Sequence, residues 1–249
     1  MRTDADQLSD LKIDDLYLFL DFDGTLVELA STPDGITVPD DLPDLLSRLH
    51  RRLDGRLALV SGREVATLER FLPDFPGDIF GAHGAEARRN GTLARHALVG
   101  SAVVADVQQR ARTAVGEVAG LTLETKDTGA VIHYRGAPEA ASDALAAARG
   151  IAEAAKGMEL HTSKMAYEIR PADASKAGAV RTVMEDQPTG IRPAVIGDDV
   201  TDEEAMVVAN ARDGLCIRVG EGETCAAYRL PDTAAVRRLL QDWAAQGAA

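Results

Sequence analysis

The sequence has few cysteines, few aromatic residues and little positive charge. It contains 2 cysteines among 249 residues, which is too few for a disulfide framework. Lys and Arg number 27 against 40 Asp and Glu, so the formal net charge is −13, and no basic stretch is long enough for a nucleic-acid-binding surface. Aromatic residues make up 4% of the chain, so its core must be built mainly from Ala, Val, Leu and Ile.

Long apolar runs are also missing. No run approaches the roughly 18 residues that a membrane-spanning helix requires. Residues 1–12 are acidic and lack the apolar segment of a signal peptide. We therefore expect a cytoplasmic protein that binds neither nucleic acid nor a membrane, and we expect a monomer.

The hydrophobic residues, 45% of the chain, fall in short runs separated by helical patterns. Apolar runs predict buried strands at 16–20, 57–60, 193–197 and 215–219. Helical patterns cover 40–55, 64–72 and 176–185, and further helices begin near 201 and 233, while 78–91 reads as a strand entering turns. Helical crossovers between such strands indicate a parallel sheet with covered faces. The sequence therefore predicts an α/β, Rossmann-like core with helices on both faces.

The middle of the chain has a different pattern, in which a helix and two strands occur twice. The helical segments are 102–118 and 138–156, and the strand-like segments are 121–126, 130–135, 158–163 and 165–170. Short links between neighbouring strands favour an antiparallel sheet. We therefore predict an inserted α+β lid over residues 100–171 within a core formed by residues 1–99 and 172–249.

Several polar side chains directly follow a predicted core strand or open a helix. They are Asp21, Asp23, Ser61, Lys176, Asp198, Asp199 and Asp202. Ligands of open α/β sheets bind outside the carboxyl ends of the strands. We therefore expect these groups, which are far apart in the sequence, to meet at one edge of the sheet.

The chemistry of this group favours phosphoryl transfer. Clustered carboxylates repel one another unless a cation lies between them. These segments offer oxygen donors and no His or Cys, so Mg²⁺ is favoured over Zn²⁺. Ser61, Lys176 and the amides of the turn 23–25 remain to bind an anion. An aspartate can act as a nucleophile by forming an aspartyl-phosphate.

The segments DFDGT (21–25), VSGR (60–63) and GDDVTDE (197–203), together with Lys176, resemble the four motifs of the haloacid dehalogenase-like phosphatases. The resemblance implies that Asp21 is the nucleophile. It implies that Asp23 protonates the leaving oxygen and later activates water. The other implied roles are phosphate binding by Thr25, Ser61 and Lys176, Mg²⁺ binding by Asp21, Asp198 and the carbonyl of Asp23, and support from Asp199 and Asp202.

A closer resemblance, over residues 16–204, is to the trehalose-6-phosphate phosphatases. The segments that carry it are GDDVTDE (197–203), GAHGAE (81–86), LETK with AVIHYR (123–126 and 130–135) and YEIRP with SKAGAV (167–171 and 175–180). One departure from the family pattern is Ala177, which separates Lys176 from Gly178. The resemblance implies hydrolysis of trehalose 6-phosphate. The substrate-binding residues that we expect from it are Arg63, His83, Glu124, Lys126 and Glu168.

Other interpretations of the same residues stay open. Arg63 could form a structural ion pair, His83 could be structural, and the charged lid residues could be solvated strand charges. The substrate could be another sugar phosphate, of the sucrose phosphate or mannosyl-phosphoglycerate type, or the protein could be a phosphomutase. A receiver-like phospho-acceptor without enzymatic activity also combines aspartates, a hydroxyl and a lysine, but it is about half as long and has no lid.

Overall fold

The structure is a computed structural model that describes residues 3–30, 32, 35–163 and 165–246. These residues form two compact units. The first, called the core unit here, comprises the described residues up to Ala94 and from Ser175 onward. The second, called the inserted unit, is Arg95–Ala174.

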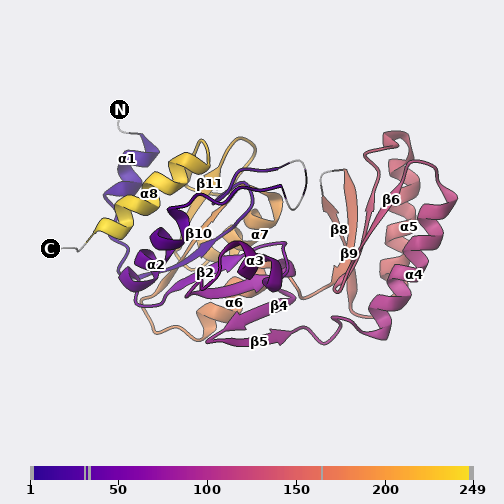
Figure 1. Cartoon of the computed structure of the whole chain (residues 1–249), viewed down its shortest axis with the longest axis horizontal. Helices are drawn as coiled ribbons and strands as arrows, with labels where there is room; N and C mark the ends of the chain where they lie inside the picture. Colours follow the sequence, from indigo (N-terminus) through magenta and orange to yellow (C-terminus); the bar gives the residue numbers. More distant parts are fainter. Residues whose placement is uncertain (1–2, 31, 33–34, 164, 247–249) are drawn as a thin grey trace. The chain divides into compact units, whose positions relative to one another are not determined.

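The core unit contains an eight-stranded sheet in the order β12-β11-β10-β1-β2-β3-β4-β5 (Figure 1). The strands are β1 (Leu16–Leu20), β2 (Leu57–Val60), β3 (Asp78–Gly81), β4 (Glu86–Arg89), β5 (Thr92–Arg95), β10 (Arg192–Gly197), β11 (Leu215–Val219) and β12 (Tyr228–Leu230). Every pairing from β12 through β3 is parallel. β1 lies between β10 and β2. The chain first adds β2 to β5 on one side of β1 and later adds β10 to β12 on the other side.

Helices cover both faces of this sheet, as the sequence predicts. On one face, Leu18 and Leu20 pack with apolar residues of α1, α2, α3 and α8. On the other, Tyr17 and Phe19 pack with α6 and α7. The alternation of side chains along β1 thus supplies both hydrophobic cores. The helices are α1 (Asp4–Ser9), α2 (Leu42–Arg52), α3 (Val65–Phe71), α6 (Lys176–Glu185), α7 (Val200–Asn210) and α8 (Thr233–Ala245).

The inserted unit is an antiparallel sheet with helices, in the predicted order of elements. Its strands are β6 (Thr122–Lys126), β7 (Gly129–His133), β8 (Met158–Ser163) and β9 (Ala166–Pro171), in the sheet order β6-β7-β9-β8. Its helices are α4 (Ala102–Glu117) and α5 (Ala141–Ala154). Ile132 and Ile169 pack with Val107 of α4 and other apolar residues in a separate hydrophobic core. The helix predicted from residue 138 begins as a 3₁₀ turn, Pro138–Ala140, before α5.

Four helices and strands were not predicted, namely β4, β5, α1 and β12. The segment 78–91 was expected to be one strand entering turns, but it contains β3, a 3₁₀ turn at Ala82–Gly84 and β4. β4 is followed by Asn90 and Gly91, both with positive φ (49° and 74°), and then by β5. The short helix α1 and the three-residue strand β12 were also missed.

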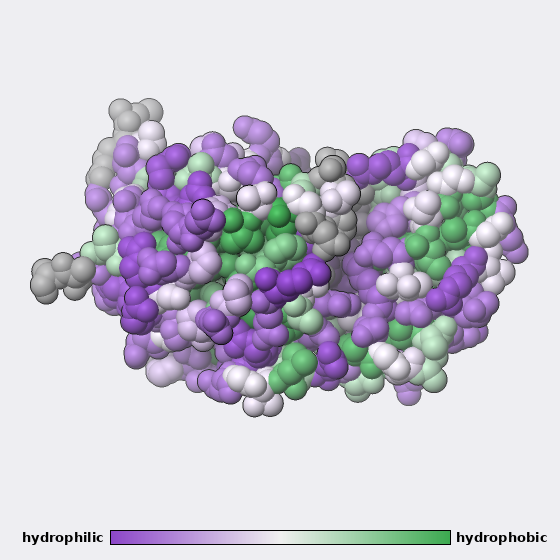
Figure 2. Space-filling view, viewed as in Figure 1, coloured by the Kyte–Doolittle hydropathy of each residue, from purple (hydrophilic) through white to green (hydrophobic). Residues whose placement is uncertain are grey.

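The surface is mostly hydrophilic on the face drawn in Figure 2, with hydrophobic patches over the core unit and over the helices of the inserted unit. Within the described part of the chain, no helix is long and apolar enough to cross a membrane.

Candidate functional site

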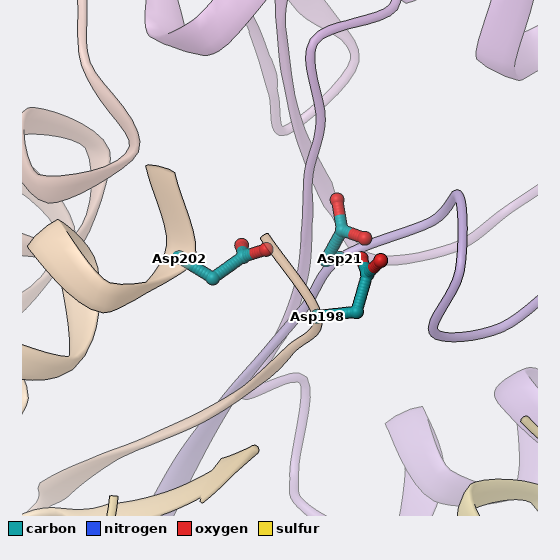
Figure 3. A group of neighbouring side chains, drawn as sticks. All are labelled: Asp21, Asp198 and Asp202. Atoms are coloured by element: carbon teal, nitrogen blue, oxygen red, sulfur yellow. The ribbon is translucent and has the colours of Figure 1, made fainter. Parts of the chain in front are cut away.

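Three aspartates meet at the carboxyl ends of β1 and β10 (Figure 3). Asp21 directly follows β1, Asp198 directly follows β10, and Asp202 lies in the first turn of α7. One carboxylate oxygen from each lies within 4.8 Å of the other two. Asp21 and Asp202 are almost fully buried, with exposed fractions of 5% and 2%. The site therefore concentrates negative charge where water is largely excluded.

Two glycines allow the aspartates to come this close. A Cβ on Gly24, which has φ 78°, would lie 2.3 Å from Oδ2 of Asp198. A Cβ on Gly197 would lie 2.2 Å from Cγ of Asp202. Both distances are far below van der Waals contact, so a side chain at either position would displace a carboxylate.

Lys176 lies between two of these carboxylates. Its Nζ donates to Oδ1 of Asp21 and to Oδ1 of Asp202, each at 2.7 Å. Lys176 is the first residue of α6, and the preceding Ser175 caps the helix by accepting the N–H of Gly178. Ala177, the departure from the family pattern, leaves this arrangement intact.

The electrostatics of the site call for a further cation. Burial, with the charge of Asp202 adding to it, raises the pKa of Asp198 to about 6. Burial also raises the pKa of Asp21 well above its ordinary value, against the opposing effect of Lys176. Burial alone would lower the pKa of Lys176, but Asp202 and Asp21 outweigh it and raise that pKa. One ammonium therefore faces three carboxylates, and their all-oxygen donor set fits a hard divalent cation.

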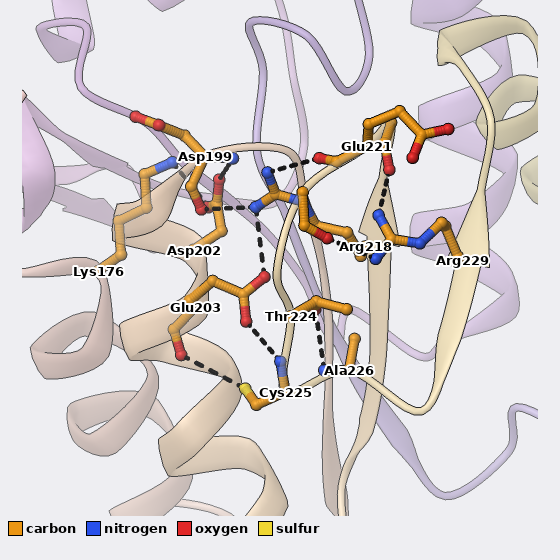
Figure 4. A network of polar contacts seen from close by, with 12 residues as sticks. Lys176, Asp199, Asp202, Glu203, Arg218, Glu221, Thr224, Cys225, Ala226 and Arg229 are labelled. Atoms are coloured by element: carbon orange, nitrogen blue, oxygen red, sulfur yellow. Dashed lines mark hydrogen bonds and ion pairs between the residues drawn. The ribbon is translucent and has the colours of Figure 1, made fainter. Parts of the chain in front are cut away.

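The loop that carries Asp198 is held by a network of polar contacts (Figure 4). Oδ2 of Asp202 accepts the N–H of Asp199, the N-cap residue of α7, at 3.1 Å. Nη1 of Arg218, a buried residue of β11, donates to the Asp199 carbonyl (3.1 Å) and to Oε1 of Glu203 (3.2 Å). Arg218 was not among the predicted site residues. The signal that could have identified it is a charged residue inside an otherwise apolar strand.

Asp23 forms an ion pair with Arg63. Nε and Nη2 of Arg63 donate to the two Asp23 oxygens at 2.6 and 2.7 Å. The Arg63 guanidinium also lies over the rings of Phe22 and Phe71, with its Cζ 5.9 and 5.3 Å from their centroids. Of the two readings that the sequence left open for Arg63, a substrate contact or an ion pair, the structure contains the ion pair.

The predicted phosphate-binding hydroxyls are both buried. Ser61 follows β2, and its Oγ accepts the N–H of Arg63 at 3.2 Å. Thr25 is fully buried, and its Oγ1 has no hydrogen-bond partner in the part of the chain that the structure describes. The Gly24 amide, which was expected to be available for an anion, instead donates to the carbonyl of Val27 at 2.8 Å. This bond closes the turn after Asp23.

His83 lies against the Ser61 loop. Its backbone N–H donates to the Ser61 carbonyl at 2.9 Å. A Cβ on Gly62 would lie 2.7 Å from the His83 Nε2, so the ring packs closely on that glycine. His83 has φ 56°, in the left-handed region, so its backbone turns sharply to make these contacts.

In the inserted unit, the charged residues expected to contact a sugar share one face of the sheet. The strand register places Glu124 opposite Val131 and Val131 opposite Glu168, so all three lie in one row. Nζ of Lys126 donates to Oε1 of Glu168 at 2.9 Å. Oε2 of Glu124 lies 3.0 Å from Nε2 of His133, and this hydrogen bond holds the pKa of Glu124 below its ordinary value.

Two histidines on this face were missed as site candidates. His133 pairs with Glu124, and His161 lies directly opposite Glu168 in the β8–β9 register. Residues of the opposite face, such as Ile132 and Tyr167, belong to the hydrophobic core. The period-two alternation of each strand was the signal that could have identified both histidines.

A family model for trehalose-phosphatases matches residues 19–233. The trehalose-6-phosphate phosphatase of Escherichia coli (strain K12) is 33% identical over 213 residues, which cover 85% of this chain and 80% of that protein. The region matched by the family model includes every candidate site residue described above, from Asp21 to Arg218. The resemblance that the sequence motifs indicate is therefore confirmed.

Solved structures show the same fold. The crystal structure of a trehalose-6-phosphate phosphatase related protein has a TM-score of 0.74 and 29% identity, and the match covers 93% of this chain and 98% of that one. A haloacid dehalogenase-like hydrolase from Bacteroides thetaiotaomicron has a TM-score of 0.62 and 19% identity, and the match covers 91% of this chain and 98% of that one. The second likeness concerns the fold alone.

Proposed function

Because the chain belongs to the trehalose-phosphatase family, we propose that it hydrolyses trehalose 6-phosphate to trehalose and inorganic phosphate. The observation that carries the proposal is the site at the end of β1. There a buried aspartate, Asp21, lies beside a buried ammonium, Lys176, and two further carboxylates. An oxygen nucleophile among positive groups and metal ligands suits attack on a phosphate ester.

In the first step, an Asp21 oxygen attacks the phosphorus of the substrate. The new bond from Asp21 to phosphorus forms as the bond from phosphorus to the sugar oxygen breaks. Asp23 donates a proton to that departing oxygen, so trehalose leaves as a neutral alcohol. The product left on the protein is an aspartyl-phosphate at Asp21.

In the second step, Asp23 takes a proton from a water molecule as the water oxygen attacks the phosphorus. The bond between Asp21 and phosphorus breaks, and inorganic phosphate leaves with the Asp21 carboxylate restored. Asp23 has then regained the proton that it gave to the sugar. Lys176 holds the Asp21 carboxylate in place throughout, as its 2.7 Å contact in the structure suggests.

We propose that the divalent cation is Mg²⁺ and that Asp21, Asp198 and the Asp23 carbonyl hold it. When bound, it would neutralise carboxylate and phosphate charge and so ease the approach of Asp21 to the phosphoryl group. Both oxygens of Asp202 already accept hydrogen bonds, from Lys176 and from the Asp199 amide. These bonds favour a supporting role for Asp202 and Asp199 over direct metal binding.

The phosphate oxygens would be bound by Ser61, Thr25 and Lys176. Thr25 supports this assignment because its buried hydroxyl has no hydrogen-bond partner in the described chain, and such a group is costly unless something bonds to it. We further propose that the inserted unit acts as a cap that recognises the sugar. Its polar sheet face offers both carboxylates and an ammonium to sugar hydroxyls.

The test of the proposed function is a phosphate-release assay over a panel of sugar phosphates with Mg²⁺ present. We expect the highest kcat/KM for trehalose 6-phosphate. A higher value for sucrose 6-phosphate or a mannosyl-phosphoglycerate would identify the alternative phosphatases. Stable self-phosphorylation without phosphate release would identify a phospho-acceptor. The monomeric state and the cytoplasmic location stay predictions from the sequence.

Replacing Asp23 by Asn is expected to leave substrate binding intact and to remove proton transfer, which is typically worth about 10²–10⁴-fold in rate. The loss should be smaller for p-nitrophenyl phosphate, because p-nitrophenolate leaves without being protonated. Steady-state kinetics on both substrates measures the difference. An equal loss on both would argue that Asp23 serves only to hold the metal.

Alanine at Glu124, Lys126 or Glu168 is expected to lower kcat/KM for trehalose 6-phosphate by about 10²-fold or more, because a site built for hydroxyls depends on each hydrogen bond. Hydrolysis of p-nitrophenyl phosphate, which has no sugar, should barely change. Glu117→Ala, at the end of α4, is a matched carboxylate control. If both substrates suffer alike, the three residues are structural, and if neither does, they are solvated charges.

A further inference from the structure

We propose that Arg63 is a positioning residue that fixes the orientation of the Asp23 carboxylate for proton transfer, rather than a residue that binds the substrate. This inference rests on the proposed function, because it concerns the group that protonates the leaving oxygen. It is carried by the contacts of Arg63 with Asp23, by the aromatic rings around the guanidinium and by the backbone bonds of its loop.

The pair between Arg63 and Asp23 has bidentate geometry. Nε bonds one carboxylate oxygen at 2.6 Å and Nη2 bonds the other at 2.7 Å. A planar guanidinium that bonds both oxygens fixes the plane of the carboxylate as well as its position. A lysine ammonium is a compact charge without this planar fork, so it would fix the plane of the carboxylate less well.

Arg63 is the fixed partner of the two. Its side chain is 13% exposed, whereas the Asp23 side chain is 27% exposed. The rings of Phe22 and Phe71 both lie at cation–π distances from the guanidinium. The Arg63 carbonyl accepts the Ala82 N–H at 2.7 Å, and its own N–H donates to Ser61 Oγ. Backbone and side chain are thus both held, so Arg63 can set where Asp23 points.

The loop of Arg63 is further held by a buried carboxylate. Oε2 of Glu86, which is 4% exposed, accepts the N–H of Val65 at the start of α3, at 2.9 Å. This bond anchors the first turn of α3 two residues after Arg63. The donor to Asp23 therefore belongs to a rigid part of the core unit, which is what a positioning group requires.

The pair with Arg63 does not occupy the whole Asp23 carboxylate. An ionised carboxylate offers about four lone-pair sites, and a bidentate guanidinium uses two of them. The remaining sites are not used by Arg63. Arg63 would thus hold Asp23 so that a free site faces the leaving oxygen, and misplacement by about 1 Å can cost about 10²-fold in rate.

The experiment compares wild type, Arg63→Met and Arg63→Lys on trehalose 6-phosphate and p-nitrophenyl phosphate. Met keeps an apolar stem over the two rings and removes the donors. We expect kcat for trehalose 6-phosphate to fall by about 10²-fold with KM little changed, and a smaller fall for p-nitrophenyl phosphate. Lys should restore part of the rate, since it keeps the charge but lacks the planar bidentate fork.

The double variant Asp23→Asn/Arg63→Met supplies the decisive readout. If Arg63 acts through Asp23, the double variant should be no slower than Asp23→Asn alone, because the carboxyl group that Arg63 orients is already absent. Additive losses would overturn the proposal. So would a rise in KM on both substrates at unchanged kcat, which would make Arg63 a substrate contact, or full activity of Arg63→Met.

Two controls separate this inference from other failures. Arg88→Met removes another largely buried arginine, 17% exposed, that pairs with Glu69 outside the site, and it should keep wild-type kinetics. Thermal unfolding of each variant shows whether it is folded. If Arg63→Met does not fold, the kinetics of Arg63→Lys decide the outcome. If wild type does not hydrolyse trehalose 6-phosphate, the proposed function fails, and the same comparison runs on the sugar phosphate that wild type does hydrolyse.

Discussion

Replacing Asp21 by Asn is expected to abolish phosphate release from trehalose 6-phosphate. An amide is a poor nucleophile and a poor ligand for a hard cation, so one change removes both of the roles proposed for Asp21. Loss of a covalent nucleophile can cost roughly 10⁶-fold in kcat. Because Asn is nearly isosteric and can still accept a bond from Lys176, the variant should remain folded. Phosphate release over long incubations at high enzyme concentration measures the loss.

Asp213→Asn is a suitable control for this variant. Asp213 precedes β11, at the opposite end of the strand from the site, and its φ of 53° is one that Asn tolerates. This variant should retain wild-type activity. Acid quenching during turnover should trap phosphate on wild type and none on Asp21→Asn. Wild-type rates from Asp21→Asn would show that another group is the nucleophile.

Removal of divalent cations is expected to eliminate activity completely, and added Mg²⁺ should restore it. One carboxylate oxygen from each of Asp21, Asp198 and Asp202 lies within 4.8 Å of the other two, and Lys176 is the positive partner of Asp21 and Asp202. A phosphate group would bring further negative charge to this site, and repulsion would oppose it. Phosphate release after treatment with EDTA, followed by stepwise addition of Mg²⁺, measures both effects.

The choice of ion provides the control for this experiment. Mg²⁺ should restore more activity than Ca²⁺, which prefers more ligands at longer distances, and more than Zn²⁺, which prefers nitrogen and sulfur. Circular dichroism should show that the chelated protein is still folded, so that the loss is not one of structure. Full activity after exhaustive chelation would contradict the mechanism.

The parts of the fold that the sequence predicts are those with strong local patterns. β1 and β2 are short apolar runs that end in polar residues, and α6 begins at Lys176, as expected. The β4–β5 hairpin was missed although Asn90 and Gly91 are a strong hairpin signal. All four residues of β5 are exposed, so no apolar alternation marks this strand.

The site was predictable as a set of residues but not as a set of contacts. Asp21 and Asp198 were identified because each ends an apolar strand, and the sheet topology then brings them together. The partner of Asp23 could not be deduced, because Arg63 is 40 residues away and its choice depends on how β2 and α3 pack. Arg218 was hidden for the same reason, since its partners lie on α7 and in the loop before it.

The core unit is assembled from two stretches of chain on either side of the inserted unit. β1 is among the first strands to be synthesised, but β10, one of its two neighbours in the sheet, begins only at Arg192. The inserted unit is one continuous stretch, so all of it leaves the ribosome before β10 does. During synthesis, β1 therefore has one unpaired edge, a kind of surface that is prone to aggregate. The buried pair of Asp21 and Lys176, 155 residues apart, cannot form until after that interval.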